Sequence, residues 1–158
     1  MRPHRRVSLL ALAFFAAACL STDPTGVPDP IDPADDSYHS SLNIRIADMT
    51  RLASGVYIQD VVVGTGTVAE ANSRIQVFYS GFLTNGTRFD TNIGGTVREF
   101  ALDSLIGGWR AGVPGMRVGG RRKLVVPSSL GYGVQGIPGV IPGNANLVFD
   151  IQLAGIRQ

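Results

Sequence analysis

The sequence predicts an α+β domain, an antiparallel sheet of five to six strands with one short helix across it. Residues 145–153 alternate strictly between apolar and other side chains, which is typical of a strand with one buried face. Residues 74–83 alternate in the same way and run into Asn85-Gly86, a strong hairpin signal because both residues tolerate positive φ. Between 105 and 116 the apolar residues follow helical spacing instead.

Each element follows from its local pattern. Strands are predicted at 57–63, 74–83, 87–90, 98–102, 121–126 and 145–153. The helix is weak on intrinsic propensity, because it contains glycines at 107, 108 and 112, so packing of Trp109 must hold it. The basic cluster 121–123 is expected to be a solvated sheet edge that discourages pairing with other sheets.

Residues 1–18 are predicted to be a secretory signal peptide that is not part of the fold. A basic start precedes an apolar run, and three alanines stand directly before Cys19. Ala16-Ala17-Ala18-Cys19 resembles a bacterial lipobox, which implies that Cys19 is acylated and anchors the mature chain to a membrane. That motif prefers leucine where Ala16 stands, so ordinary cleavage after Ala18 is the alternative. The expected location is the bacterial cell envelope, on the periplasmic side.

The remaining chain divides by composition. Residues 19–40 are rich in proline and aspartate and are predicted to form an extended, solvated linker. Residues 41–52 fit neither period well and are interpreted as a pre-domain segment with a helical turn at 46–52. Residues 53–158 are enough for one domain with a single core.

The charge balance argues against nucleic acid as a partner. The whole chain carries a formal charge of +2, but three of its 14 basic residues leave with the signal, so 11 basic residues face 12 acidic ones. The mature chain has no sustained basic stripe of the kind that phosphate backbones require.

The residues for covalent or metal catalysis are missing from the predicted domain. No cysteine follows Cys19, and His39 is the single histidine after the signal. The predicted domain therefore lacks the residues for a serine triad or for a zinc site of nitrogen and sulfur ligands. No glycine-rich stretch completes a phosphate loop either. We expect no metal, no cofactor and no covalent intermediate.

Two features point instead to an apolar binding pocket. The loop 131–144 keeps Tyr132, Ile137, Val140 and Ile141 between stiffening prolines, which favours a flap beside a pocket. The alternative is a loop whose apolar residues pack on their own domain. Six aromatic residues could together line an apolar concavity, although for any one of them alone a place in the core is the preferred interpretation: Tyr79, Phe89, Phe100, Trp109, Tyr132 and Phe149.

Several separated motifs, in order, resemble the FKBP-type peptidyl-prolyl cis-trans isomerases over about residues 55–153. They are Val77-Phe78-Tyr79-Ser80-Gly81, Gly86-Thr87-Arg88-Phe89-Asp90, Ile106-Gly107-Gly108-Trp109, Leu130-Gly131-Tyr132-Gly133, Ile137-Pro138-Gly139-Val140-Ile141-Pro142 and Asn146-Leu147-Val148-Phe149-Asp150. The resemblance implies a strongly curved sheet wrapped around the short helix, with a pocket between them.

The resemblance also implies a role for each pocket residue. Trp109 would form the floor, and Tyr79, Phe89, Phe100 and Phe149 the walls. Leu105 and Ile106 would border the pocket, with the Ile106 N–H donating to a substrate carbonyl. Tyr132 would supply a hydroxyl, Asp90 would lie beside the imide carbonyl, and Ile137, Val140 and Ile141 would form the flap. Tyr79, Asp90, Trp109, Tyr132 and Phe149 are the implied catalytic set.

The sequence departs from the family pattern in one region. Arg98 stands where a second aromatic residue is frequent, and residues 91–97 are short and lack the arginine that often neighbours the aspartate. Residues 103–105 are also abbreviated, and Ile137 replaces the histidine of some members. These changes concern one pocket wall and the surroundings of Asp90.

The implied function is cis-trans isomerisation of X–Pro bonds in exported proteins, without covalent chemistry. The partners would be proline-containing peptides, unfolded exported proteins and macrolide inhibitors. One alternative is a non-catalytic peptide-binding or chaperone module of the same fold, and another is a structural envelope lipoprotein without a ligand.

Overall fold

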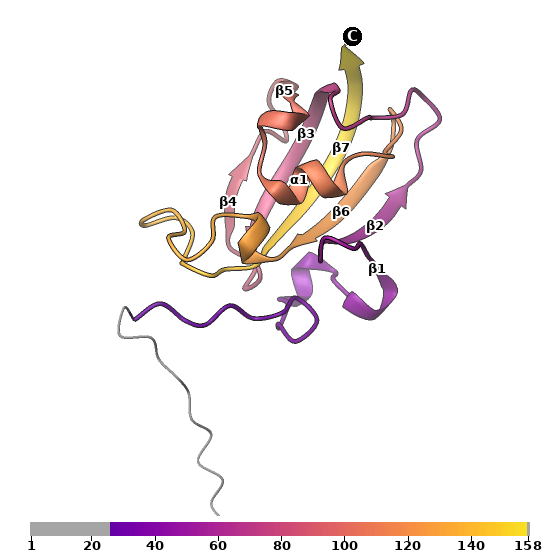
Figure 1. Ribbon diagram of the computed structural model, residues 1–158. Coiled ribbons are helices and arrows are strands. Elements are labelled where there is room, and N and C mark those ends of the chain that lie inside the picture. Colours follow the sequence, from indigo (N-terminus) through magenta and orange to yellow (C-terminus); the bar gives the residue numbers. More distant parts are fainter. Residues whose placement is uncertain (1–25, 158) are drawn as a thin grey trace, which may run out of the picture.

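The computed structural model describes residues 26–157, in which a short helix lies across one face of an antiparallel sheet (Figure 1). The sheet has seven strands: β1 (Thr50–Arg51), β2 (Tyr57–Val62), β3 (Arg74–Leu83), β4 (Arg88–Thr91), β5 (Arg98–Ala101), β6 (Arg121–Val126) and β7 (Leu147–Arg157). The α-helix is α1 (Gly107–Gly112), and short 3-10 turns occur at Ser40–Leu42, Ile46–Asp48, Leu102–Ser104 and Ser128–Leu130.

The strand order is β1-β2-β6-β7-β3-β4. Because β7 occupies one edge of β3 along its whole length, β4 and β5 share the other edge, one after the other. The predicted α+β architecture is confirmed. The sheet exceeds the expected six strands because Thr50–Arg51, expected within a helical turn, pairs with Tyr57 and Ile58 of β2.

The period of two in the long strands separates two faces. Alternate residues of β3, β6 and β7 point toward α1 and form the main core with Trp109 and Val113. The predicted inner face of the last strand is confirmed, because Leu147, Phe149, Ile151 and Leu153 all belong to this core. Val125 and Val148 point the other way, into a second apolar cluster.

Close packing on the sheet explains the glycine-rich helix. A Cβ at Gly108 would come within 2.3 Å of Val126, and one at Gly112 within 2.7 Å of Leu124. The glycines therefore let α1 lie against β6, and this contact offsets their poor helix propensity. The prediction that packing of Trp109 holds the helix fits its burial in the main core.

The segment before the domain differs from the predicted extended linker. Leu42 and Met49 are buried with Tyr57, Val125 and Val148 on the sheet face opposite α1. Upstream, Pro33 is buried, and the Asn144 and Asn146 side chains donate to the carbonyls of Pro28 and Ile31. Apolar residues in 38–49 gain more by covering this face than by remaining in water, so the chain folds back along the sheet.

The basic cluster 121–123 is not a sheet edge, because β6 lies between β2 and β7. Arg122 is buried and makes a bidentate pair with Asp60 at 2.7 and 2.9 Å. Its Nη1 also donates to the carbonyls of Gly112 and Pro114 at the end of α1. Arg121 and Lys123 both pair with Asp150 of β7. The three basic side chains therefore link β6 to β2, to β7 and to the end of α1.

The predicted signal peptide, residues 1–18, and Cys19 lie outside the described residues, so the structure does not test the predicted boundary between them. Within 26–157, none of the helices combines the length and the apolar character that a membrane crossing requires. Over the same range, acidic and histidine side chains do not gather into a group of three that would hold a metal ion.

Candidate active site

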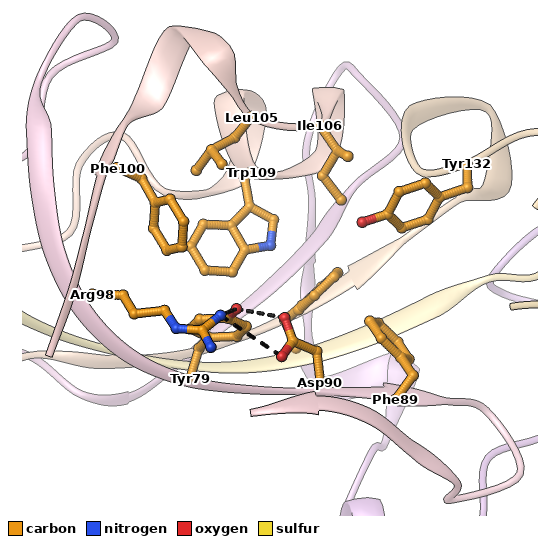
Figure 2. A pocket seen from close by; sticks show the side chains of 10 residues that line it. Tyr79, Phe89, Asp90, Arg98, Phe100, Leu105, Ile106, Trp109 and Tyr132 are labelled. Atoms are coloured by element: carbon orange, nitrogen blue, oxygen red, sulfur yellow. Dashed lines mark hydrogen bonds and ion pairs between the residues drawn. The ribbon is translucent and has the colours of Figure 1, made fainter. Parts of the chain in front are cut away.

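A cavity of about 270 Å³ lies between α1 and the sheet (Figure 2). Its walls come from β3, β4, β5, β7, the start of α1 and the loop after β6. Ten side chains line it: Tyr79, Phe89, Asp90, Arg98, Phe100, Leu105, Ile106, Trp109, Tyr132 and Phe149. Six of these are aliphatic or aromatic without a charge or hydroxyl, so most of the lining is apolar.

Trp109 is the centre of an aromatic cage. Its ring meets those of Tyr79, Phe149 and Phe100 edge-on, with centroids 5.3, 5.5 and 6.3 Å away. Phe89 extends the cage through an edge-on contact of 5.8 Å with Phe149. Such T-shaped pairs place positive ring edges on negative ring faces and fix the rings in one arrangement.

Gly81 of β3 makes room for two of these rings. A Cβ there would come within 2.7 Å of the Phe89 ring and 3.0 Å of the Phe149 ring. The strand neighbours of Gly81 are Asp90 on one side and Phe149 on the other. A side chain at 81 would therefore fill the space where the two walls meet.

Three polar groups of the pocket, on Tyr79, Asp90 and Arg98, are linked into a polar chain by hydrogen bonds and an ion pair. The Tyr79 hydroxyl donates to Asp90 Oδ2 at 2.5 Å and accepts from Arg98 Nη1 at 3.1 Å. Arg98 Nη1 is 3.9 Å from Asp90 Oδ1, which makes an ion pair (dashed lines, Figure 2). Burial, followed by the hydrogen bond to Asp90, raises the pKa of Tyr79 to about 12. The phenol therefore stays protonated at neutral pH.

Asn92 holds the strands that carry Asp90 and Arg98. It follows β4, and its buried side chain accepts from the Tyr79 N–H at 2.7 Å and donates to the Val77 carbonyl at 2.9 Å. A second donation, to the Thr96 carbonyl, ties the connection that leads to β5. The amide thus replaces strand pairing in the gap between β4 and β5.

Tyr132 enters the cavity from the loop after β6, and its hydroxyl points toward the other lining side chains (Figure 2). Burial, and then the negative charge of Asp90, raises the pKa of Tyr132. The loop is closed by hydrogen bonds from Gly133 to Ser128 and from Asn144 to Gly133. Tyr132 is thus a neutral hydroxyl on a fixed support.

The three predicted flap residues lie outside the cavity lining. Ile137 and Ile141 form a two-way backbone bridge at 2.8 Å in each direction, and Ile141 is buried in the main core. Val140, at the tip between them, is 48% exposed. The alternative of a loop that packs on its own domain describes Ile141, whereas Val140 remains open to a ligand from solvent.

Nine of the twelve predicted catalytic and substrate-binding residues meet at the cavity: Tyr79, Phe89, Asp90, Phe100, Leu105, Ile106, Trp109, Tyr132 and Phe149. Their individual roles stay predictions. Arg98 is the lining residue that sequence reasoning did not include. The pattern that could have identified it is the alternation of a strand. Arg98 and Phe100 lie two residues apart on β5, so they face the same side.

Comparison with curated proteins finds relatives among FK506-binding proteins. FK506-binding protein 4 of Rhizopus delemar is 41% identical over 111 residues, which cover 69% of this chain and 29% of that protein. The 46 kDa FK506-binding nuclear protein of Spodoptera frugiperda is 43% identical over 110 residues, covering 68% and 27%. The chain matches less than a third of the length of these relatives.

These relatives contradict the predicted location in a bacterial cell envelope. They are eukaryotic FK506-binding proteins, and one carries the word nuclear in its name. The expected membrane anchor and exported clients depended on that location and lose their support with it. The prediction rested on the sequence around Cys19, which lies outside the described residues.

Solved structures share the fold. A peptidyl-prolyl cis-trans isomerase from Pseudomonas syringae pv. tomato matches with a TM-score of 0.67 and 33% identity, over 75% of this chain and 87% of that one. FkpA from Escherichia coli matches with a TM-score of 0.65 and 34% identity, over 70% and 52%.

The family model described as FKBP-type peptidyl-prolyl cis-trans isomerase matches residues 66–154. That range includes β3 to β6, most of β7 and all ten residues of the cavity lining. The chain therefore belongs to the FKBP-type peptidyl-prolyl cis-trans isomerase family.

Proposed function

We propose that this chain accelerates rotation about X–Pro bonds, and that the cavity over Trp109 is where it does so. The observation that carries the proposal is the cavity itself, an aromatic cage with a hydroxyl, a carboxylate and a guanidinium on one side. The cage is suited to a proline ring, because its walls are aromatic and the ring is apolar.

The physical basis is the resonance of the amide bond. Rotation crosses a barrier of about 18–20 kcal/mol because the twisted bond loses its partial double-bond character. The twisted amide also has less charge separation than the planar one. An apolar cage solvates the planar form poorly, so it lowers the free-energy difference between the planar and twisted states.

Hydrogen bonds to the substrate then hold the twisted geometry. The Tyr132 hydroxyl and the backbone N–H of Ile106 are the groups we assign to substrate carbonyls, and Asp90 lies across the cavity from them. No bond in the substrate is broken, so the residues need only bind the twisted peptide more tightly than the planar one.

The proposal is tested by following cis-to-trans relaxation of short X–Pro peptides with and without the protein. We expect acceleration, and we expect a macrolide that occupies the cavity to abolish it. Asp90→Val and Phe149→Tyr should each lower kcat/KM by roughly tenfold, equivalent to about 1.4 kcal/mol. Phe78→Tyr is the matched control, because Phe78 lines a different hollow on the opposite sheet face.

Circular dichroism and thermal unfolding would establish that each variant is folded. Absence of acceleration by a folded wild-type chain, across peptides with different residues before proline, would contradict the proposal. Macrolide or peptide binding without acceleration would then favour a non-catalytic binding module.

A further inference from the structure

Arg98 gives the cavity a charge that an apolar peptide does not require. Of the ten lining residues, it is the one with a positive side chain, and Asp90 is the one with a negative side chain. The guanidinium lies beside the Tyr79 hydroxyl and Asp90, across the cavity from Ile106 and Tyr132 (Figure 2). It is thus part of the wall that a bound peptide would touch.

Most of the hydrogen-bonding capacity of Arg98 is unused. A guanidinium has five N–H donors, and the contacts of Arg98 are the 3.1 Å bond from Nη1 to Tyr79 and the 3.9 Å ion pair with Asp90. Among the described residues, its other N–H groups meet no acceptor at hydrogen-bond distance. The side chain is 51% exposed, so those donors are open to a ligand.

Arg98 and the aromatic cage lie on opposite ends of one residue, Tyr79. Tyr79 connects the two places, because its ring contacts Trp109 and its hydroxyl contacts Arg98. Consecutive Cα atoms are about 3.8 Å apart. A proline over Trp109 therefore brings the side chain of a flanking residue to the position of the guanidinium.

We infer that Arg98 selects substrates that carry a carboxylate on a residue flanking the proline. This inference rests on the proposed function. A carboxylate matches the planar guanidinium with two parallel hydrogen bonds, which a single carbonyl oxygen cannot do.

The negative charge of Asp90 repels an incoming carboxylate but does not cancel the attraction between that carboxylate and Arg98. Its Oδ2 already accepts from Tyr79, and its Oδ1 is beyond hydrogen-bond distance from Nη1. The remaining donors of Arg98 belong to the part of the guanidinium that Asp90 does not hold. A substrate carboxylate there forms hydrogen bonds, whereas its repulsion from Asp90 acts over a longer distance.

The experiment compares peptides that differ only in carrying Glu, Gln or Lys, placed before or after the proline, with the full chain and three variants. In wild type, kcat/KM for the Glu peptide should exceed that for the Gln peptide several-fold at one of the two positions. In Arg98→Gln the ratio should fall to about one. In Arg98→Glu, the protein should prefer Lys over Gln at that position.

Arg110→Gln is the matched control, because Arg110 is an exposed arginine of α1 that does not line the cavity. It removes the same charge and should keep the Glu preference. The preference should also weaken as salt rises from about 0.01 to 1 M, because the pair is partly exposed.

The outcomes separate the two proposals. Failure to accelerate any peptide overturns the proposed function. Acceleration of Gln and Glu peptides at equal rates by wild type keeps the proposed function and overturns the selection by Arg98. An equal loss for both peptides in Arg98→Gln would assign Arg98 to a backbone carbonyl and would also overturn it.

Discussion

At the scale of single residues, Tyr79 belongs both to the aromatic cage and to the polar side of the cavity. Its ring contacts Trp109 and Phe100 within the cage, and its hydroxyl connects Asp90 to Arg98. The hydroxyl both donates and accepts, which requires the phenol to remain protonated. A phenylalanine at 79 would keep the cage and break the polar chain.

We predict that Tyr79 titrates near pH 12, and that its neighbours shift this pKa in opposite directions. Asp90→Asn should lower the pKa toward the ordinary 10.0, because the hydrogen bond and the negative charge of Asp90 both raise it. Arg98→Gln should raise it, because the positive charge of Arg98 lowers it. The measurement is the ultraviolet absorbance of phenolate, taken as wild type minus Tyr79→Phe.

The same shift gives a stability effect with a defined sign. An unfolded tyrosine ionises near pH 10.0, whereas folded Tyr79 holds its proton to about 12. Its contribution to the free energy of unfolding is therefore complete below pH 10 and is lost as pH rises toward 12. Titration of wild-type Tyr79 near 10 would show that its hydroxyl is exposed and that the polar chain does not form.

At the scale of elements, the gap between β4 and β5 determines where the charged residues lie. Both strands pair with β3, but neither pairs with Phe78, and the amide of Asn92 joins them across the gap. One side chain thus positions Asp90 on one strand and Arg98 on the other. The segment 91–97 can be short because Asn92 takes over the bonds of a longer strand.

We predict that Asn92→Ala destabilises the protein by about 2–4 kcal/mol, because it leaves the Tyr79 N–H and two carbonyls unpaired in a buried region. It should also lower kcat/KM, since Asp90 and Arg98 lose their common support. Denaturant unfolding measures the first effect and the peptide assay measures the second. Asn72→Ala, at an exposed turn, is the control and should change neither. Equal stability of the two variants would contradict the role of Asn92.

The sequence predicts elements whose pattern is local and repeated. The alternation in β3 and β7 and the turn at Asn85-Gly86 suffice to place both strands and their inner faces. Two-residue β1 is too short for a period to show. The bonds of Asn92 and the pairing of Arg122 with Asp60, 62 residues away, depend on tertiary contacts that no local pattern contains. For the same reason, Arg98 was recognisable as a departure from the family but not as part of the polar chain.

At the scale of the whole molecule, apolar residues pack against both faces of the sheet. The main core and the cavity lie on the side of α1, and the segment 38–49 closes the other side over Val125 and Val148. Hydrogen bonds also hold the start of this segment in place. His39 donates its N–H to the Thr84 carbonyl, and Tyr38 donates its hydroxyl to the Pro33 carbonyl at 2.6 Å. Burial, followed by the charge of Asp36, raises the pKa of Tyr38.

The chain upstream also reaches the loop that carries Tyr132. Asn146 donates to the Ile31 carbonyl and to Asp36 Oδ2, each at 2.9 Å, and its Oδ1 accepts from the Ser128 N–H. Ser128 in turn accepts from Gly133, next to Tyr132. These bonds join the segment before the predicted domain to one end of the active-site loop, so residues 27–49 belong to the folded unit.

We predict that Leu42→Ala lowers the free energy of unfolding by about 2–4 kcal/mol, because it removes a buried side chain from the second cluster. The effect on kcat/KM under conditions where the variant is folded should be small, since Leu42 lies on the sheet face away from the cavity. Arg45→Ala is the control. Its side chain is 84% exposed and makes a surface pair with Asp48, which is worth at most about 1 kcal/mol. Equal stability of the two variants would show that 38–49 covers the sheet without contributing to the fold, and the domain would then begin near residue 53.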